Sequence, residues 1–382
     1  MSSTSRPPRV VVAPDSFKGS LGAVEVCAAV EAGVRRAYPD ADVTAVPMAD
    51  GGEGTLDCFL SALGGQEMAL TAADPLGRPV RARYALSAHG DSAVVELAAA
   101  SGLPLVADAD PDPLRADTAG TGELIADAVD HGAREILVCI GGSASTDGGT
   151  GLLRALGVRF LDAAGDELPP GGAALARLAA IDDEGVAKTV RETRFRVACD
   201  VTNPFVGPSG AAEVFGPQKG ATPDQVRELD AALARFADVL AEHTGVRVHD
   251  LPGAGAAGGT CGGLVALLGA EPAGGAELVA DTVGLPAALD GADLVLTGEG
   301  RVDGQSAGGK AVSVVAALAR ERGVPAVALA GSVAGPFEEL HALGLTAAFS
   351  LADGPRTLDE LTGSAARLLA DLAEQVVRLR LG

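Results

Sequence analysis

The stretch from Val10 to Leu21, VVVAPDSFKGSL, restricts the possible folds more than any other part of the chain. Four consecutive apolar residues end at Pro14, and a polar turn and an amphipathic pattern follow. This order predicts a buried parallel strand that leads into a helix. Asp15, Ser16 and Lys18 would then lie at the carboxyl end of the strand, where open α/β sheets bind their ligands. Asp15 and Ser16 could equally be only turn and cap residues.

Alternating strands and helices recur at both ends of the chain. After the first strand, the pattern predicts a helix over 21–38, a strand over 43–47, a helix over 56–63, and, from 277, a helix to 289, strands over 293–297, 326–330 and 347–351, and helices over 311–322, 337–343 and after Thr357. Such alternation is typical of a parallel sheet. Two strands before a long interruption and three after it fit a flavodoxin-like, doubly wound sheet. We therefore assign 1–70 and 276–382 to one discontinuous domain.

The interruption, residues 71–275, predicts a second α/β domain inserted into the first. Buried strands near 93–97, 135–140 and 195–199 are expected, and the last two lead into glycine-rich loops over 141–151 and 200–222. Thr222 and Gln225 form a capping box with Pro223 at the first helical position, which predicts a helix to about 242.

Composition excludes several functions. The net charge of −22 over 382 residues argues against nucleic acid or an anionic membrane as a partner. No apolar run approaches the length of a membrane span, and the five cysteines form no CxxC pair, so we expect a cytoplasmic protein with reduced thiols. Its oligomeric state is not predicted.

The lysines are few and distinctive. Only four of the 29 basic residues are Lys, and Lys18, Lys219 and Lys310 lie in glycine-bearing turns. A compact ammonium beside a glycine-rich backbone suits phosphate binding. Exposed glycine turns also accept Lys for no functional reason, so the pattern alone does not establish such a site.

Two well-known motifs are matched only in part. Gly253, Gly255 and Gly258 spell GxGxxG, but no clean buried strand precedes them, as a dinucleotide site requires. The GxxxxGK of 304–310 is followed by Ala311 instead of the Ser or Thr that holds Mg²⁺. The serines of 141–149 lack a GxSxG elbow, which disfavours a serine hydrolase.

Carboxylates and lysines in glycine loops instead fit phosphoryl transfer, in which carboxylates hold Mg²⁺ and cations neutralise the phosphates. The candidate carboxylates are Asp15, Asp50, Glu53, Asp147, Asp200, Glu299 and Asp303. Asp200 directly follows a predicted strand and precedes Asn203 and Pro204. An Asx-turn that holds this Asn-Pro bend is an equally good explanation of Asp200.

Six segments resemble the signature segments of the type 1 glycerate kinase family of bacteria, in the family's order and across nearly the whole chain. They are APDSFKGSL (13–21), MADGGEGT (48–55), IGGSASTDGGTG (140–151), CDVTNPFVGPSGAAEVFGPQKGA (199–221), GAGAAGG (253–259) and TGEGRVDGQSAGGK (297–310). The resemblance implies Mg²⁺- and ATP-dependent phosphorylation of D-glycerate to 2-phosphoglycerate, and a flavodoxin-like domain with an inserted α/β domain. Thr146 stands where the family often has Asn.

Under this hypothesis both ligands bind in a cleft between the domains. Asp200, Lys18 and Asp15 form the catalytic set, with Asp200 orienting or deprotonating the glycerate hydroxyl, and Asp50 and Glu53 lie near Mg²⁺. The nucleotide set is Gly51, Gly52, Glu299, Gly300, Lys310 and Lys219; the substrate set is Ser143, Asp147, Asn203 and Arg301. The glycerate carboxylate could meet Arg301, Arg78 or Lys219. A nicotinamide-dependent oxidoreductase and a non-catalytic metabolite-binding protein remain as alternatives.

Overall fold

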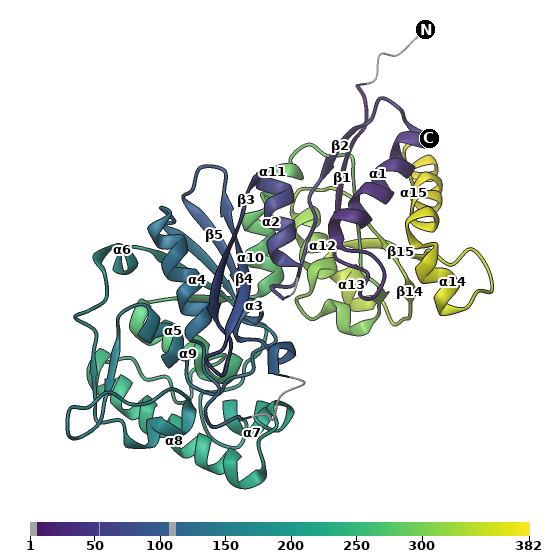
Figure 1. The fold of residues 1–382 in the computed structure, drawn as a ribbon. Coiled ribbons are helices and arrows are strands. Elements are labelled where there is room, and N and C mark those ends of the chain that lie inside the picture. Colours follow the sequence, from purple (N-terminus) through teal and green to yellow (C-terminus); the bar gives the residue numbers. More distant parts are fainter. Residues whose placement is uncertain (1–5, 53, 107–111) are drawn as a thin grey trace. The chain divides into compact units, whose positions relative to one another are not determined.

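The computed structural model describes residues 6–52, 54–106 and 112–382, and the chain divides into two compact units (Figure 1). Unit 1 consists of Met1–Asp50, Asp57–Gly64 and Gly275–Gly382, and unit 2 consists of Gly51–Leu56 and Gly65–Gly274. Both units mix helices with strands, so the α/β class is confirmed. Within the described ranges, no helix has the length and apolar character that crossing a membrane requires.

Unit 1 is built on a parallel sheet. Its elements are β1 (Arg9–Pro14), α1 (Ala23–Ala37), β2 (Asp42–Ala45), most of α2 (Thr55–Leu63), α10 (Gly275–Thr282), α11 (Leu285–Ala288), β11 (Leu294–Gly298), β12 (Arg301–Val302), α12 (Ala311–Glu321), β13 (Ala326–Ala330), β14 (Ser332–Val333), α13 (Glu338–Leu343), β15 (Leu345–Ser350), α14 (Leu358–Gly363) and α15 (Ala365–Leu381). The main sheet has the order β15-β13-β11-β1-β2, and every neighbouring pair is parallel.

The five predicted parallel strands are therefore present. Counted along the chain, their order is 2-1-3-4-5, which is the flavodoxin-like order of a doubly wound sheet. The chain leaves β1 toward β2 on one side and returns as β11 on the other, so the topological switch point lies between β1 and β11. Ligands of such sheets bind beside the carboxyl ends of the strands at this point.

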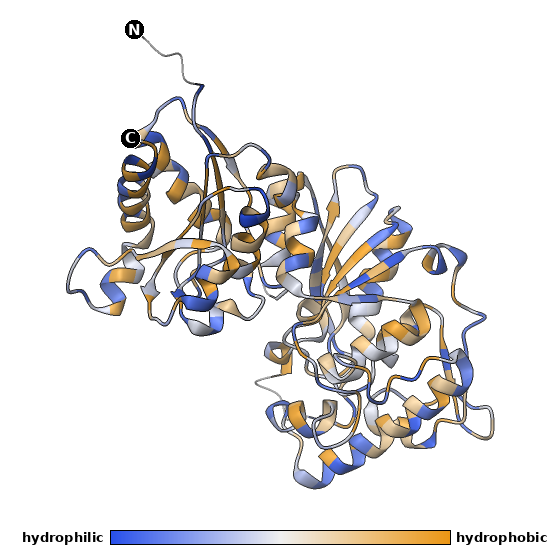
Figure 2. Cartoon of the chain, turned by 180° about the vertical axis from the view of Figure 1, so that it is seen from behind, coloured by the Kyte–Doolittle hydropathy of each residue, from blue (hydrophilic) through white to orange (hydrophobic). Residues whose placement is uncertain are grey.

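Each face of this sheet has its own hydrophobic core, because successive side chains of a strand point to opposite faces. Val11 and Ala13 of β1 belong to a core with residues of α10, α12 and α13. Val10 and Val12 belong to another with residues of α1 and α15. Figure 2 shows the resulting pattern, with apolar strands and an α15 that alternates between polar and apolar residues. The run VVVA is apolar throughout because both of its faces are covered.

Unit 2 contains a mixed sheet. Its elements are β3 (Gly65–Ala73), β4 (Pro79–Ser87), β5 (Ser92–Glu96), α3 (Ala98–Ser101), α4 (Ala119–Asp130), β6 (Glu135–Cys139), α5 (Thr150–Ala155), β7 (Arg159–Leu161), β8 (Ala180–Asp182), α6 (Lys188–Arg191), β9 (Arg194–Ala198), α7 (Ala211–Phe215), α8 (Pro223–Thr244), α9 (Thr260–Leu268) and β10 (Glu271–Ala273). The main sheet has the order β10-β9-β6-β5-β4-β3, in which β3-β4 and β4-β5 are antiparallel and the other pairs are parallel.

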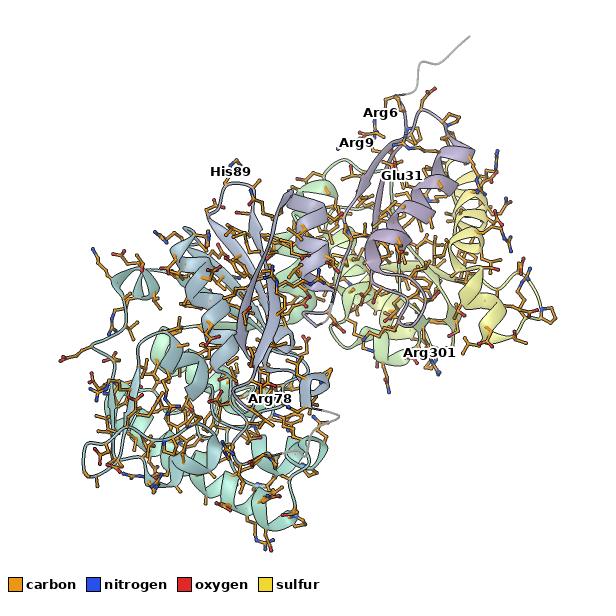
Figure 3. All side chains as sticks on the ribbon, in the orientation of Figure 1. Arg6, Arg9, Glu31, Arg78, His89 and Arg301 are labelled. Atoms are coloured by element: carbon orange, nitrogen blue, oxygen red, sulfur yellow. The ribbon has the colours of Figure 1, made fainter. Side chains whose placement is uncertain are left out.

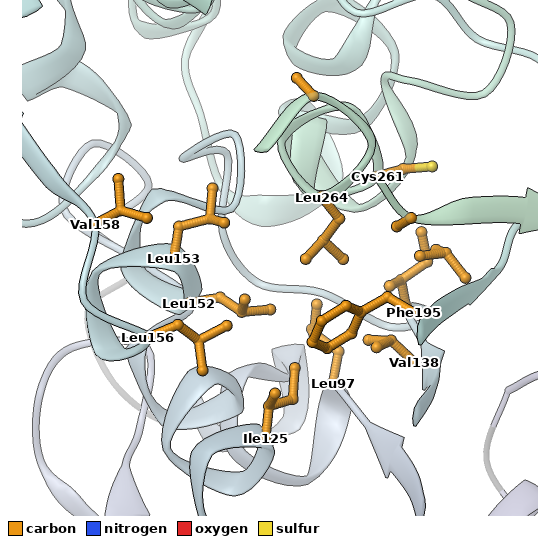
Figure 4. Packing of buried hydrophobic residues seen from close by; sticks show 14 of the residues in the cluster. Leu97, Ile125, Val138, Leu152, Leu153, Leu156, Val158, Phe195, Cys261 and Leu264 are labelled. Carbon is orange, nitrogen blue, oxygen red and sulfur yellow. The ribbon is translucent and has the colours of Figure 1, made fainter. Parts of the chain in front are cut away.

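The core of unit 2 lies between this sheet and the helices that follow its parallel strands. Figure 4 shows part of it, where Phe195 of β9 packs with Leu152 of α5, Ile125 of α4 and Leu264 of α9. The predicted capping box at Thr222 is confirmed: its hydroxyl accepts from the Gln225 N–H, and α8 begins at Pro223.

Some predicted boundaries differ from the structure. β3 pairs with β4 along its whole length, so the second unit resumes at Gly65 and not at 71. The helix predicted over 277–289 is two helices, because Gly284 between α10 and α11 adopts a φ of +76°. The predicted cap at Thr357 is present, but the last helix is interrupted at Ser364 and continues as α15.

Candidate functional site

Three neighbouring strands of unit 1 end in carboxylates at the switch point. Asp15 follows β1, Asp50 lies beyond β2, and Glu299 follows β11. The Asp15 N–H donates to the carbonyl of Gly298 at 2.8 Å, so the loops after β1 and β11 are tied together at their start. The polar exits recognised in the sequence therefore converge at one edge of the sheet.

The electrostatics of these carboxylates are perturbed by burial. Asp15 is only 8% exposed, and burial raises its pKa to about 6 against the stabilising Ser16 N–H, which donates to it at 2.6 Å. The charges of Asp50 and Glu299 raise this pKa further. Burial also raises the pKa of Glu299, although the Ser306 hydroxyl donates to its Oε1 at 2.5 Å. Such shifts are a mark of functional sites.

Two predicted phosphate-binding lysines lie close to this edge. Lys18 is 83% exposed along its side chain, and its Nζ lies 3.9 Å from Asp50 Oδ2, so it makes only a weak ion pair. Both Lys18 and Lys310 lower the pKa of Glu299 through their charge, which places both near that carboxylate. Lys310 is exposed at the N-cap of α12, and the N-terminus of a helix favours anions.

Arg301 and Arg78, two of the cations proposed for the substrate carboxylate, make different contacts. The Arg301 Nε donates to Asp303 Oδ2 at 2.8 Å, and its side chain is 69% exposed (Figure 3). The Arg78 Nε donates to Asp74 Oδ2 at 2.5 Å, and its Nη2 donates to the carbonyl of Leu105 at 3.1 Å. Arg78 thus closes the turn between β3 and β4, while Arg301 keeps donors available to solvent.

The glycines of the nucleotide set shape the backbone. Gly51 has a φ of +82°, and the Gly52 carbonyl accepts from the Thr55 hydroxyl at 2.8 Å at the start of α2. Gly300 lies against the loop after β1, where an added Cβ would be 3.6 Å from the backbone nitrogen of Lys18. Glu53, assigned to the metal set, lies outside the described residues. Among the residues that are described, no group of three or more acidic, His or Cys side chains could hold a metal ion.

Ser16 is not a helix cap. α1 begins at Ala23, its N-cap is Gly22, and the Glu25 carboxylate accepts from the Gly22 N–H at 2.9 Å. The structure therefore removes the explanation of Ser16 as a cap.

In unit 2, Lys219 is buried beside the serines of the loop after β6. Its Nζ donates to Ser143 Oγ at 2.9 Å and also to the Ser145 carbonyl, and the residue is only 5% exposed. Burial lowers the pKa of Lys219 to about 7, against the charge of Asp147. The hydroxyls of Ser145 and Thr146 are buried and have no hydrogen-bond partner among the described residues. The predicted residues Lys219 and Ser143 are thus in direct contact.

Asp147 organises this loop. It is fully buried, and its carboxylate accepts from the Thr118 N–H and hydroxyl at 3.1 and 2.8 Å and from the Gly149 and Gly151 N–H groups at 3.2 and 3.0 Å. These donors belong to the beginnings of α4 and α5. The geometry therefore gives Asp147 a supporting role behind the serines.

Asp200 and Asn203 lie in the loop after β9, the strand next to β6. Asp200 is exposed and is the second residue after the strand. The Asn203 side-chain amide donates to the carbonyl of Ser209 at 2.8 Å and closes the loop. Asp200 is thus presented at the carboxyl end of the sheet, as a residue that contacts a ligand must be.

The GxGxxG glycines are explained by packing. An added Cβ at Gly255 would lie 2.1 Å from the Pro204 carbonyl, and one at Gly258 would lie 2.1 Å from the Ser145 carbonyl. The described stretch 249–252 before them contains no strand. These glycines let the 253–259 segment approach the loops after β6 and β9, and the context of a dinucleotide site is missing.

Sequence reasoning missed several residues of these sites. Thr118 holds Asp147, and Ser306 holds Glu299. Asp117 next to Thr118 is buried, and its pKa is raised to about 6 by burial and by the charge of Asp147. The segment DTAGTGE, 117–123, combines Thr and Gly before a helix and is the signal that could have found Asp117 and Thr118.

Comparisons with known proteins give a consistent result. A model of the glycerate kinase family matches residues 10–381. The chain is 44% identical to the glycerate kinase of Halalkalibacterium halodurans, over 96% of this chain and 97% of that protein. It is 45% identical to the glycerate 2-kinase of Escherichia coli, over 92% of each. A crystal structure of a protein from Salmonella typhimurium LT2 superposes with a TM-score of 0.90 at 44% identity and covers 98% of both chains.

Proposed function

The chain belongs to the glycerate kinase family, and we propose that it transfers the terminal phosphoryl group of ATP to D-glycerate. The family match over residues 10–381 is the observation that carries this proposal. The enzyme is a phosphotransferase with an alcohol group as acceptor. Because the Escherichia coli relative is named a glycerate 2-kinase, we place the transferred group on the 2-hydroxyl.

The loops at the switch point of unit 1 serve the phosphates of ATP in this proposal. Lys18 and Lys310 both lie near Glu299 and are exposed, so they can exchange water for phosphate oxygens at little cost. The loop after β11 lies against the backbone at Lys18, with Gly300 at the contact. Phosphoryl transfer spreads negative charge over the transferring group, and fixed cations stabilise that charge.

Mg²⁺ would be held mainly by the nucleotide. Mg²⁺ usually keeps several waters and takes one or two carboxylates together with phosphate oxygens. Asp50, near Asp15 and Lys18, is a suitable carboxylate ligand, and Glu53 remains assigned with it. When bound, the ion would neutralise the charge that develops on the phosphates. The high pKa of Asp15 suits it to share or release a proton nearby.

The loops of unit 2 serve glycerate. Ser143 and Lys219 offer a hydroxyl and an ammonium in contact, a combination that suits a carboxylate. Arg301 of unit 1 remains a second candidate for that carboxylate, because it is exposed. Asn203 shapes the loop that carries Asp200, and Asp147 fixes the loop that carries Ser143.

Asp200 is proposed as the group that orients or deprotonates the acceptor hydroxyl. It is an exposed carboxylate at a strand end, so it can accept a hydrogen bond from the hydroxyl as the oxygen attacks phosphorus. The proton passes to the carboxylate as the new O–P bond forms and the bond to ADP breaks. The nicotinamide alternative loses its support, because its glycine motif is explained by packing.

A coupled assay of ADP release tests these roles. Wild-type enzyme should release ADP with D-glycerate and ATP, and the product should be the 2-phosphate. Asp200→Asn should reduce kcat by roughly a hundredfold or more, the typical contribution of a general base. Asp250→Asn, an exposed carboxylate outside the assigned loops, is the matched control and should leave turnover unchanged.

The KM values for ATP and for glycerate distinguish the residues that bind the nucleotide from those that bind the acceptor. Lys310→Ala should raise the KM for ATP, and an effect confined to the KM for glycerate would move Lys310 to the acceptor side. Near-normal turnover of Asp200→Asn would refute the role of Asp200. Ligand-induced stabilisation without any ADP release would instead favour a metabolite-binding protein.

A further inference from the structure

The strand β3 lies at one edge of the mixed sheet of unit 2, beside β4. Its nine residues pair with β4 in one continuous register, and they include a single charged residue, Glu67, and no proline. The strand at the opposite edge, β10, has only three residues. Folded proteins usually shorten, bend or charge an edge strand, because its free N–H and C=O groups can pair with another chain. β3 has almost none of this protection.

Two hydrogen bonds show which backbone groups of β3 face the free edge. Directly after the strand, the Asp74 N–H donates to the Arg78 carbonyl at 2.7 Å, so position 74 is bonded across the hairpin. The Ala73 N–H donates instead to the Glu123 carboxylate at 2.8 Å. Because the bonded side alternates from residue to residue in an antiparallel pair, the odd-numbered residues of β3 direct their backbone N–H and C=O groups away from β4.

Three of these odd-numbered residues leave the edge open. Glu67, Ala69 and Thr71 are exposed, and their backbone N–H and C=O groups have no hydrogen-bond partner within the ranges that the structure describes. At Ala73 the edge is closed, because the start of α4 lies against it: an added Cβ at Gly120 would be 1.9 Å from the Ala73 carbonyl oxygen. The open part of the edge is therefore the stretch 67–71.

A second copy of the chain fits this stretch by two-fold antiparallel pairing centred on Ala69. Glu67 of each copy then lies opposite Thr71 of the other, and all three exposed residues exchange N–H···O bonds. On the inner face, Met68 of each copy lies opposite Leu70 of the other. Both side chains are half-buried at the margin of the core of unit 2, so the pairing would cover the apolar surface that they still expose.

The charges on the outer face agree with the same register. The neighbour of Thr71 on β4 is Arg81, so Glu67 of one copy approaches Arg81 of the other across Thr71. Arg81 is exposed and makes no ion pair in the described part of the chain. Within its own chain, Glu67 already pairs with Arg83 at 2.8 Å. Each Glu67 would thus lie between two arginines, and opposite charges on neighbouring strands favour pairing.

We propose that the chain forms a homodimer in solution by pairing of the two β3 strands, which joins the mixed sheets of two copies into one. An extended segment of another protein could pair with the same backbone groups. A second copy of this chain also supplies the matching apolar and charged side chains. The pairing uses no residue of the proposed kinase site, so its test does not depend on kinase activity.

Sedimentation equilibrium of the full-length protein, from submicromolar to submillimolar concentrations, should show a monomer–dimer equilibrium. Ala69→Pro should raise the Kd of the dimer by about tenfold or more, because each copy loses a central donor and carries a ring at the seam. The hairpin tolerates this proline, since the Ala69 N–H points away from β4. Circular dichroism and thermal unfolding should therefore show a folded monomer. A protein that stays monomeric at every concentration would overturn the proposal.

Charge reversal tests the register without a change in the backbone. Arg81→Glu should raise the Kd of the dimer by about twofold to tenfold, and the double variant Glu67→Arg with Arg81→Glu should restore most of the affinity. Arg177→Glu makes the same change in charge at an exposed position outside β3 and β4, and it should leave the Kd unchanged. Equal effects of Arg81→Glu and Arg177→Glu, or no rescue by the double variant, would refute this register.

Hydrogen exchange of the peptide amides locates the interface directly. In wild type the amides of Glu67, Ala69 and Thr71 should exchange more slowly as the protein concentration rises, whereas those of Met68 and Leu70 should be protected by β4 at every concentration. The concentration dependence should disappear in Arg81→Glu at concentrations where that variant is monomeric. A dimer in which the three edge amides still exchange as fast as in the monomer would place the interface elsewhere and overturn the proposal.

Discussion

Replacing Asp15 by Asn should stabilise the folded protein at neutral and alkaline pH, although Asp15 belongs to the proposed site. The pKa of Asp15 rises from 3.8 to about 6 on folding, and burial is the largest cause. The folded state therefore holds the proton more tightly than the unfolded state between these values. The contribution of Asp15 to the free energy of unfolding is highest below pH 3.8, falls as the pH rises through about 6, and stays low above that pH. Asn removes the buried charge but keeps an oxygen for the Ser16 N–H.

The size of the effect follows from the shift. The pKa of Asp15 differs by about two between the folded and unfolded states, which corresponds to about 3 kcal/mol of unfolding free energy at pH 8. This value is an upper bound because Asp15 keeps some contact with solvent. For a domain of 150–250 residues, 1 kcal/mol shifts Tm by about 2–4 °C, so the transition of unit 1 should rise by several degrees. Thermal unfolding followed by circular dichroism at pH 8 and at pH 4.5 measures both predictions. At pH 4.5 the gain should largely disappear.

Asp303→Asn is the matched control. Its pKa is lowered, chiefly by the Gln305 N–H that donates to it, so removing its charge should give no gain at pH 8. Kinase activity of Asp15→Asn should fall while its stability rises, the usual exchange at a site whose charges are held out of water. A Tm at pH 8 equal to or below that of wild type would refute the reasoning, because the raised pKa would then have no energetic consequence.

Two further predictions concern unit 2. Asp147→Asn should lower the free energy of unfolding by about 2–4 kcal/mol in urea titrations. The reason is that an amide places N–H groups opposite some of the four N–H and O–H donors around Asp147. An unchanged unfolding transition would refute the supporting role of Asp147. Lys219→Met should change how Tm depends on pH. The pKa of Lys219 falls from 10.5 to about 7 on folding, so wild-type stability should drop as the pH falls from about 10 to 7, and Lys219→Met should lack this drop.

The part of the site in unit 1 could be predicted from the sequence because it depends on local rules. A buried parallel strand is apolar on both faces, and its carboxyl end opens directly into the loop that binds ligands. The exits at Asp15 and Glu299 followed from their strands alone, and the count of five strands placed them in one sheet. β11 pairs with β1, and this pairing brings the two carboxylates together. The pairing is long-range: the strand count supported it, but no local pattern in the residues between 70 and 276 could show it.

The part in unit 2 depends on contacts that no local pattern encodes. Lys219 lies far along the chain from Ser143, and only the fold shows that its ammonium is buried against that hydroxyl. Asp147 was assigned to the substrate because it is a carboxylate in a glycine loop, a setting that suits phosphoryl transfer. The number of its donors, which decides between these roles, includes Thr118 from another segment. Pairings of this kind require the tertiary structure.

Thr146, which stands where the family often has Asn, offers a test that separates binding from folding. Its hydroxyl is buried and has no partner among the described residues, whereas the Thr118 hydroxyl donates to Asp147 and accepts from the Leu152 N–H. Thr146→Val removes an unsatisfied polar group and should leave stability unchanged or raise it by about 1 kcal/mol, while Thr118→Val should lower it by about 2–3 kcal/mol. A hydroxyl kept buried without a partner is expected to serve a ligand, so Thr146→Val should also raise the KM for glycerate and leave the KM for ATP unchanged. Destabilisation by Thr146→Val as large as that by Thr118→Val would show that the hydroxyl is used within the fold, and the buried hydroxyls beside Lys219 would then lose their place in the proposed glycerate site.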